Sequence, residues 1–321
     1  MMYGALCVCI CLATLLITAT LGAAVSAALA PMLLRFTRSW DPTPRAGALF
    51  ACRLLPAAAS LAVTAGLALP AFLVLEPAAT SERVGLRLGV LAALGLAMIS
   101  LTVFRLARVC VAGLGLTRRW KRQATLLPRF GPRMRVRQLP AAGGLVATTG
   151  IFVPTIFVSS EVVARLTAPE LSAAIAHEVG HVRSRDNLKR LLIQALGWSW
   201  GNRVLTRRWA SDCEIAADEF ALRMGAPAVE LASALLKVAQ LGRSATSAAT
   251  MASHLVPADL EGGLDERIRR LTSRLREEDR RVEAHTRLRG LPVAVGMTML
   301  AAALAHPALL RMVHDLIEKL V

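Results

Sequence analysis

An uncharged apolar run over residues 3–34 constrains the fold of this chain more than any other feature. A transmembrane helix needs about 20 consecutive apolar residues, which this run provides. Three further apolar stretches meet the same requirement, over residues 54–75, 86–108 and 291–310. The hydrophobic share of 55% also exceeds the roughly 45–50% of soluble domains. The sequence therefore predicts a mainly α-helical integral membrane protein with four transmembrane helices, and it excludes a disordered chain or an ordinary soluble enzyme.

A cleaved signal peptide is the alternative interpretation of the first run, because the small residues at 25–30 resemble a cleavage site. However, residues 1–3 contain no Lys or Arg, whereas a signal peptide begins with basic residues. The run is also longer than the apolar part of a signal peptide. We therefore expect the first run to be a transmembrane helix.

The loops between the apolar runs differ in charge. Four arginines and one acidic residue lie between residues 35 and 53, and residues 117–289 contain 28 Lys and Arg against 17 Asp and Glu. Because basic loops stay in the cytosol, both segments are expected there, with the N-terminus and the short C-terminus outside. This predicts three transmembrane helices in residues 1–116, a cytosolic domain in residues 117–289, and a fourth helix with a short tail in residues 290–321.

The charge and the cysteines exclude two other classes of protein. The net charge of +16 is explained by the membrane orientation, and no recognition motif for nucleic acid accompanies it, so we expect no nucleic-acid partner. The six cysteines lack the paired spacing of a disulfide framework, which fits a reducing compartment. The basic stretch at 265–289 predicts a charged helix whose solvated face lies near anionic lipid.

Short strands are predicted at 135–139, 145–149 and 150–158, and Pro154 indicates an edge or a bulge in the last of them. The sequence Thr-Ala-Pro-Glu at 167–170 is typical of a capping box with proline in the first helical turn. It predicts the start of the helix that contains the candidate metal-binding residues.

That helix contains His177, Glu178 and His181 in the pattern H-E-x-x-H. Residues four apart lie on one helix face, so both histidines can bind one metal ion, with Glu178 placed to take a proton from a water molecule. Two imidazoles and a carboxylate suit Zn²⁺ and leave a position for water. The alternative is a pair of surface histidines on a basic helix.

Glu214 is the best candidate for the third ligand, 33 residues after the second histidine. Asp218 shares its helix face, so one carboxylate can bind metal while the other orients a ligand imidazole. The alternative is that both are surface acids paired with Arg207 or Arg208.

Three charged residues follow the histidine motif and are expected on the same helix, namely Arg183, Arg185 and Asp186. We expect them to form structural ion pairs. For Asp186, a supporting contact to a ligand histidine is the alternative.

The run H-E-V-G-H-V-R-S-R-D-N-L at 177–188, followed by E-I-A-A-D at 214–218, resembles the BlaR/MecR-type membrane zinc metallopeptidases of the gluzincin clan. The G-I-F-V-P stretch at 150–154 and the layout of three membrane helices, a cytosolic domain and a fourth helix are also similar to theirs. Val179, Gly180 and Ala217 resemble the more distant HtpX/CAAX-protease-like relatives.

The resemblance implies that His177, His181 and Glu214 bind zinc and that Glu178 is the general base. It also implies that Asp218 supports a ligand. The chain ends soon after the predicted fourth helix, so the C-terminal sensor domain of the best-known family members is expected to be absent.

These patterns predict a zinc metalloendopeptidase of a bacterial inner membrane that cleaves a cytosolic regulator or a membrane-associated protein on the cytosolic side. An edge strand near 150–158 would hold the substrate backbone. The alternatives are a general quality-control protease like HtpX, and a non-catalytic membrane signal transducer. The expected partners are a protein or peptide substrate and the lipid bilayer.

Overall fold

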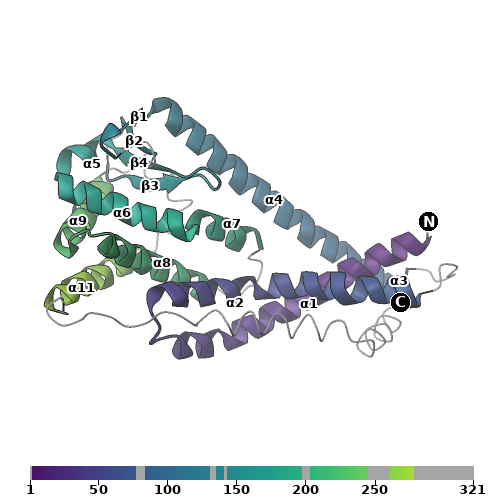
Figure 1. The fold of residues 1–321 in the computed structure, drawn as a ribbon. Coiled ribbons are helices and arrows are strands. Elements are labelled where there is room, and N and C mark those ends of the chain that lie inside the picture. Colours follow the sequence, from purple (N-terminus) through teal and green to yellow (C-terminus); the bar gives the residue numbers. More distant parts are fainter. Residues whose placement is uncertain are drawn as a thin grey trace.

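The computed structural model describes residues 2–76, 84–130, 135–140, 143–196, 203–244 and 261–277 (Figure 1). Most of them are helical, and three helical segments are long and apolar enough to cross a membrane: Tyr3–Phe36, Pro42–Leu75 and Leu86–Gln123. These segments contain the first three apolar runs of the sequence. The fourth predicted membrane helix, at 291–310, lies outside the described residues.

The second apolar segment is longer than predicted. Helix α1 spans Met2–Phe36, and α2 spans Pro42–Val63 and continues through a π-helical segment, Thr64–Ala68, into α3, Leu69–Leu75. The helix therefore begins twelve residues before the apolar run at 54, because a proline in its first turn suits a helix start and the charged residues that follow find partners.

Those partners are on α8, Arg203–Arg223. The Arg45 side chain is buried and its Nε lies 3.4 Å from the Asp212 carboxylate. The Arg53 Nε donates a hydrogen bond to the Thr206 hydroxyl at 3.3 Å. Because α8 supplies polar partners, the arginine-bearing start of α2 packs against α8.

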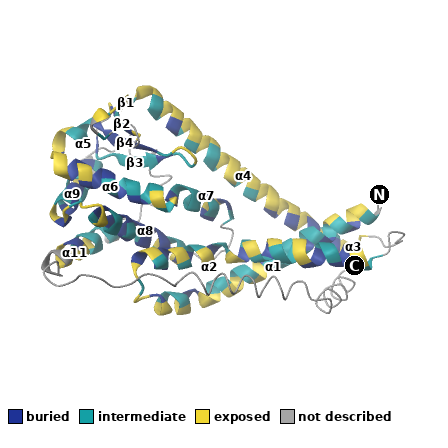
Figure 2. Cartoon of the chain, in the orientation of Figure 1, coloured by how far each residue is buried: buried dark blue, intermediate teal, exposed yellow. Residues whose placement is uncertain are grey.

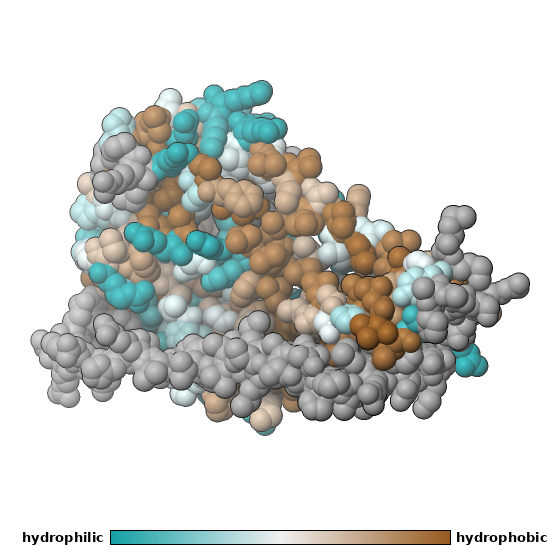
Figure 3. All heavy atoms as spheres, turned by 45° about the vertical axis from the view of Figure 1, so that its right-hand side comes forward, coloured by the Kyte–Doolittle hydropathy of each residue, from teal (hydrophilic) through white to brown (hydrophobic). Residues whose placement is uncertain are grey.

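Helix α4, Leu86–Gln123, continues well beyond the predicted boundary at 108. Lys121 and Arg122 occupy its last turn, where positive charge is favoured by the helix dipole. The helix is mostly exposed along its length (Figure 2), and hydrophobic side chains cover the surface around the long helices (Figure 3). An α4 of 38 residues is about 57 Å long, against about 30 Å for the bilayer core, so it is longer than a membrane crossing requires.

A four-stranded sheet follows α4. Its strands are β1 Thr125–Leu126, β2 Val136–Leu139, β3 Val146–Thr149 and β4 Thr155–Ser159, with a 3₁₀ turn at Pro128–Phe130 between the first two. The spatial order is β1-β2-β4-β3, with β2 and β4 parallel and the other pairs antiparallel.

The expectation of an edge strand at 150–158 is wrong. Strand β4 begins only at Thr155, is buried throughout and lies between β2 and β3. Gly150, at φ +93°, bends the chain before it, and Pro154 lies just outside the strand, so the proline removes no donor from the ladder. The outer strand on this side of the sheet is β3.

Five further helices complete the described fold: α5 Ser160–Arg165, α6 Ala168–Ser184, α7 Asp186–Leu196, α9 Ala228–Ser244 and α11 Glu261–Glu277. The sheet packs on α6 and α9 through an apolar core that includes Val158, Ile175 and Ala234. Helices α6, α7, α9 and α11 lie below the sheet and α5 beside it, and α4 runs obliquely from the sheet to the far end of α1 (Figure 1).

Candidate metal centre

The capping box at the start of α6 forms as predicted. The backbone N–H of Thr167 donates to the Glu170 carboxylate at 2.7 Å, and the Glu170 N–H donates to the Thr167 hydroxyl at 3.4 Å. Leu171 and Ile175 bury one face of the helix. This orientation brings His177 and His181 together, with their Nε2 atoms 3.2 Å apart.

Asp186 does not continue the histidine helix as expected. Arg185 adopts a left-handed conformation, φ 54°, which ends α6, and Asp186 begins α7. The Asp186 carboxylate is buried and lies 2.7 Å from Nδ1 of His181. The alternative interpretation of Asp186, a contact to a histidine of the motif, matches this geometry, because the bend at Arg185 turns it back toward His181.

Helix α8 brings Glu214 and Asp218 to the same place. It crosses α6 closely at Gly180, where a Cβ would lie 3.0 Å from the Ala217 Cα. The Glu214 carboxylate lies 3.5 Å from Nε2 of both His177 and His181. Asp218 Oδ1 lies 2.8 Å from Nδ1 of His177. One atom from each histidine and one from Glu214 thus lie within 4.8 Å of one another.

The electrostatics of this group favour a bound cation. Burial lowers the pKa of His177, but the hydrogen bond and charge of Asp218 outweigh burial, and the pKa lies above its ordinary value. Burial also lowers the pKa of His181, yet the charge of Glu214 and the hydrogen bond of Asp186 outweigh burial and raise this pKa to about 10. Burial raises the pKa of Glu214, but the contacts with both histidines hold it well below normal. A site that attracts protons this strongly attracts metal cations for the same reason.

Two arginines that the sequence did not single out contact the same carboxylates. Arg267 of α11 donates to Asp218 from Nε and Nη2, both at 2.7 Å, and to Glu214 from Nη1 at 3.1 Å. Arg190 of α7 lies 3.5 Å from Glu214. The alternative pairing of these acids with Arg208 is not seen, because Arg208 lies 3.5 Å from Asp212 instead.

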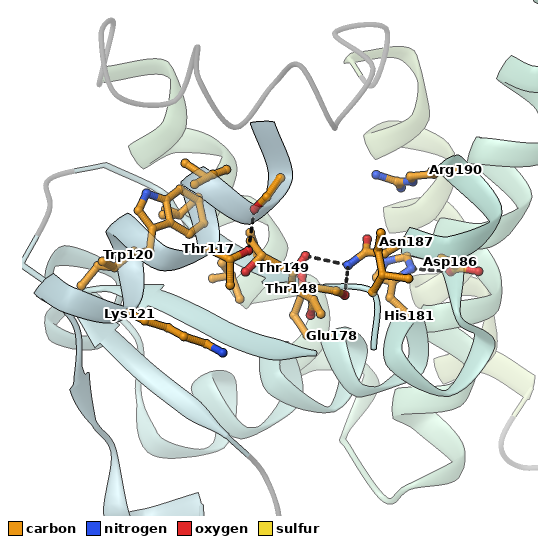
Figure 4. A pocket seen from close by; sticks show the side chains of 18 of the residues that line it. Thr117, Trp120, Lys121, Thr148, Thr149, Glu178, His181, Asp186, Asn187 and Arg190 are labelled. Atoms are coloured by element: carbon orange, nitrogen blue, oxygen red, sulfur yellow. Dashed lines mark hydrogen bonds and ion pairs between the residues drawn. The ribbon is translucent and has the colours of Figure 1, made fainter. Parts of the chain in front are cut away.

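Glu178 lies on the wall of a cavity of about 1020 Å³ between the sheet, α4, α6 and α7. The Thr148 hydroxyl on β3 donates to its carboxylate at 2.7 Å. Beside it, the Asn187 amide donates to the backbone carbonyls of Thr148 and Gly150, at 3.1 and 3.3 Å (Figure 4). The candidate base therefore faces open space next to the outer strand of the sheet.

The residues present fit a zinc ion. Two imidazole nitrogens and one carboxylate oxygen form a ligand set that zinc enzymes use with one position left open. The second nitrogen of each imidazole is held by a carboxylate, Asp218 for His177 and Asp186 for His181. This pattern fixes the tautomer and the ring orientation of metal-binding histidines.

Helices long and apolar enough to cross a membrane accompany a His–His–Glu group beside a further glutamate, an arrangement typical of the membrane metallopeptidase class. Within that class, residues 145–271 match the family described as BlaR1 peptidase M56. The match confirms the resemblance to BlaR/MecR-type peptidases, and it extends from just before β3 into α11. No curated protein and no solved structure matches the chain.

Four polar residues of the site were missed by sequence reasoning: Thr148, Asn187, Arg190 and Arg267. The first lies in a predicted strand, and the next two follow the histidine motif closely, so their positions offered a weak signal. Arg267 lies in a stretch whose many basic residues predict a solvated helix, and its contact with α8 depends on the packing of α11.

Proposed function

We propose that this chain is a zinc-dependent endopeptidase of a bacterial inner membrane, with its catalytic domain on the cytosolic side. One observation carries the proposal: His177, His181 and Glu214 converge beside Glu178 on the wall of a cavity bordered by an outer strand. We assign the first three residues as zinc ligands, and Asp218 as the carboxylate that orients His177.

Zinc, when bound, supplies the Lewis acidity that polarises a peptide carbonyl and makes water more acidic. Glu178 takes the proton of the attacking water and later delivers it to the amine that leaves. Thr148 holds the Glu178 carboxylate toward the cavity through its hydroxyl. Asp186 and Asp218 keep the imidazoles oriented while charge develops in the site.

The outer edge of β3 supports the binding of an extended substrate. The carbonyl of Leu145 accepts from Ser159 N–H at 2.9 Å, so alternate backbone groups of the strand point toward β4. The backbone N–H and C=O groups of Val146 and Thr148 then point away from β4. The carbonyl of Thr148 already accepts a hydrogen bond from the Asn187 amide. We propose that a substrate strand pairs with Val146 and with the Thr148 N–H, in place of the 150–158 segment expected from the sequence.

The position of the cavity favours a membrane-associated substrate. Val109, Gly113 and Leu116 of α4 line the cavity, together with Trp120 near the end of the helix. These residues lie directly after the part of α4 that would fill the bilayer, so the cavity would lie near the membrane surface. We propose that the substrate approaches from that surface, as a membrane protein or as a regulator bound there.

The packing of α2 on α8 supports the cytosolic orientation. Arg45 contacts α8 close to Glu214, so the turn between α1 and α2 lies on the same side as the metal centre. Both segments are rich in Arg, and basic segments stay in the cytosol. A cysteine at the exposed Met224 should resist impermeant thiol reagents in intact cells and react in inverted vesicles, in a background without the native cysteines. The opposite labelling would reverse the orientation.

Proteolysis tests the proposal directly. The full chain, purified in detergent, would be incubated with membrane and cytosolic proteins, with a Glu178→Gln variant as the matched control. Loss of a general base costs about 10²–10⁴-fold, so the variant should cleave at least a hundred times more slowly while it keeps its zinc. Equal cleavage by both proteins would contradict the assignment of Glu178, and no cleavage by either would favour a non-catalytic transducer. Cleavage of many unfolded proteins would favour quality control, and cleavage of one protein would favour a regulator.

A further inference from the structure

Arg267 reaches the candidate metal centre from a helix distant in sequence. It lies on α11, and its side chain, only 11% exposed, lies next to two carboxylates of α8. Nε and Nη2 each donate to a different oxygen of Asp218, at 2.7 Å. A two-pronged contact of this kind fixes the plane of the carboxylate as well as its distance.

The position of Arg267 follows from the packing of α11. Leu271 of α11 is buried, and Ile268 packs beside it, against Ala221 of α8 and Leu231 of α9. Residues four apart share a helix face, so the packing of Leu271 also directs Arg267 toward α8. Arg269 faces solvent and pairs with Glu266 on the same helix, so it takes no part in the centre.

The charges around the centre show why a cation is needed there. Four carboxylates surround the histidines, those of Glu178, Asp186, Glu214 and Asp218. Arg190 and Arg267 supply two positive charges, and Lys189 supplies a third, 3.5 Å from Asp186. One negative charge remains, so these cations do not neutralise the four carboxylates, and they complement a metal ion without replacing it.

We propose that Arg267 is a positioning residue that holds Asp218, and through it His177, in the orientation required for metal binding. The closer contacts run from the guanidinium to the Asp218 carboxylate at 2.7 Å, and from that carboxylate to Nδ1 of His177 at 2.8 Å, whereas Nη2 of Arg267 lies 3.5 Å from either ring nitrogen of His177. The Nε2 of His177 then faces His181 and Glu214. This inference rests on the proposed metal site and goes beyond the ligands assigned above.

Metal affinity measured on the full chain tests the inference without proteolysis. The zinc dissociation constant would be obtained by competition with a chelator. Loss of a residue that orients a ligand typically costs about 10–100-fold in metal affinity, which is the result expected for Arg267→Gln. Arg267→Lys should fall between this variant and the parent, because Lys keeps the charge but loses the two-pronged geometry. Arg269→Gln is the matched control on the same helix and should leave the affinity unchanged.

Cobalt(II) bound in place of zinc adds a readout that a purely structural role would not change. Its visible absorption depends on the geometry of the ligands, so a displaced His177 should alter the spectrum of Arg267→Gln and not that of Arg269→Gln. A folded Arg267→Gln variant with the parental zinc affinity and cobalt spectrum would overturn the inference. A parent chain that binds no zinc would overturn both the proposed function and this inference.

A double variant covers the case in which Arg267→Gln does not fold. Arg267→Gln combined with Asp218→Asn removes the Asp218 charge together with its partner, and Glu214 keeps its contact with Arg190, so the double variant should fold. If Arg267 acts through Asp218, the double variant should bind zinc as tightly as Asp218→Asn alone. A further loss of affinity in the double variant would overturn the proposed route.

Discussion

Helices α4 and α8 both depart from the usual pattern of apolar side chains inside and charged side chains outside. Helix α4 exposes apolar side chains, and α8 buries acidic ones. Only five of the 38 residues of α4 are buried, and its exposed side chains include Phe104 and Val111. Ten of the 21 residues of α8 are buried, and they include Asp212, Glu214 and Asp218. An exposed apolar surface of this kind is suited to contact with lipid, and buried acids require cationic partners. The two helices therefore need different surroundings to be stable.

The contact between Arg45 and Asp212 joins α8 to α2, another helix of membrane length, and its loss should have the largest effect on stability. Arg45→Met leaves Arg208 as the remaining ion-pair partner of the buried Asp212 carboxylate, with Arg270 acting on it more weakly. Removal of one partner of a buried pair costs about 3–5 kcal/mol, and the remaining arginine argues for the lower end of that range. Thermal unfolding in detergent measures the loss.

Two comparisons make this test specific. Arg35→Met, at an exposed position near the end of α1, should change the unfolding temperature little. Asp212→Asn combined with Arg45→Met removes both charges and should restore much of the stability. If Arg45→Met alone is as stable as the parent, the buried acids of α8 do not depend on cations from the membrane helices.

Gly95 allows a close contact between α4 and α1 in the lipid-facing region. A Cβ at this position would lie 2.4 Å from the Leu12 carbonyl oxygen, so Gly95→Ala must push the two helices apart. Overpacking costs about 1–3 kcal/mol, partly offset by about 0.5–1 kcal/mol of better helix propensity. The unfolding temperature should fall, and the zinc affinity of the folded protein should not change.

Gly180→Ala, at the contact of α6 with α8, should give the reverse pattern. Its Cβ would lie 3.0 Å from the Ala217 Cα, so a small shift suffices, but that shift separates the histidines from Glu214. We expect weaker zinc binding with a smaller change in unfolding temperature. Equal effects of both glycine variants on zinc would show that the two regions are not separable.

Thr148→Val tests whether the outer strand contributes to chemistry as well as to packing. Valine keeps the shape and the strand propensity but removes the hydrogen bond to Glu178. A hydrogen bond to a charged group contributes about 1.5–3 kcal/mol, so kcat/KM should fall by about tenfold or more. Thr149→Val is the matched control, because its buried hydroxyl has no hydrogen-bond partner among the described residues. Equal activity of both variants would remove Thr148 from the mechanism.

The last effect depends on pH and concerns a buried acid away from the metal centre. Burial raises the pKa of Glu170, but hydrogen bonds from Lys237, Ser233 and the Thr167 backbone lower it to about 2. Because the folded pKa lies below the ordinary value of about 4.3, this carboxylate stabilises the fold above that pH. The contribution is lost as the pH falls toward 2.

The parent should therefore lose stability more steeply than Glu170→Gln below pH 4.3 or so, as followed by thermal unfolding at a series of pH values. Parallel curves for the two proteins would show that the contact with Lys237 does not stabilise Glu170.

The local parts of the site were predictable from the sequence, because they depend on helical spacing. His177 and His181 share a face at a spacing of four, as do Glu214 and Asp218, and both pairs meet in the structure. The capping box at Thr167 also forms as predicted. These signals need only the geometry of one helix.

The rest depended on contacts between distant segments. Asp186 reaches His181 because Arg185 adopts a left-handed conformation, which no pattern around it indicates. The interior position of β4 depends on the parallel pairing with β2, and Arg267 depends on the packing of α11. A one-dimensional pattern contains no information on which segments meet.

The zinc content of the purified protein tests directly whether the histidine motif forms a metal centre. The detergent-purified parent, Glu178→Gln, and the double variant His177→Ala/His181→Ala would be analysed for metal after removal of loosely bound ions. We expect one zinc per chain in the parent and in Glu178→Gln, and none in the double histidine variant. Zinc that persists in the double histidine variant would contradict the metal centre and the function proposed from it.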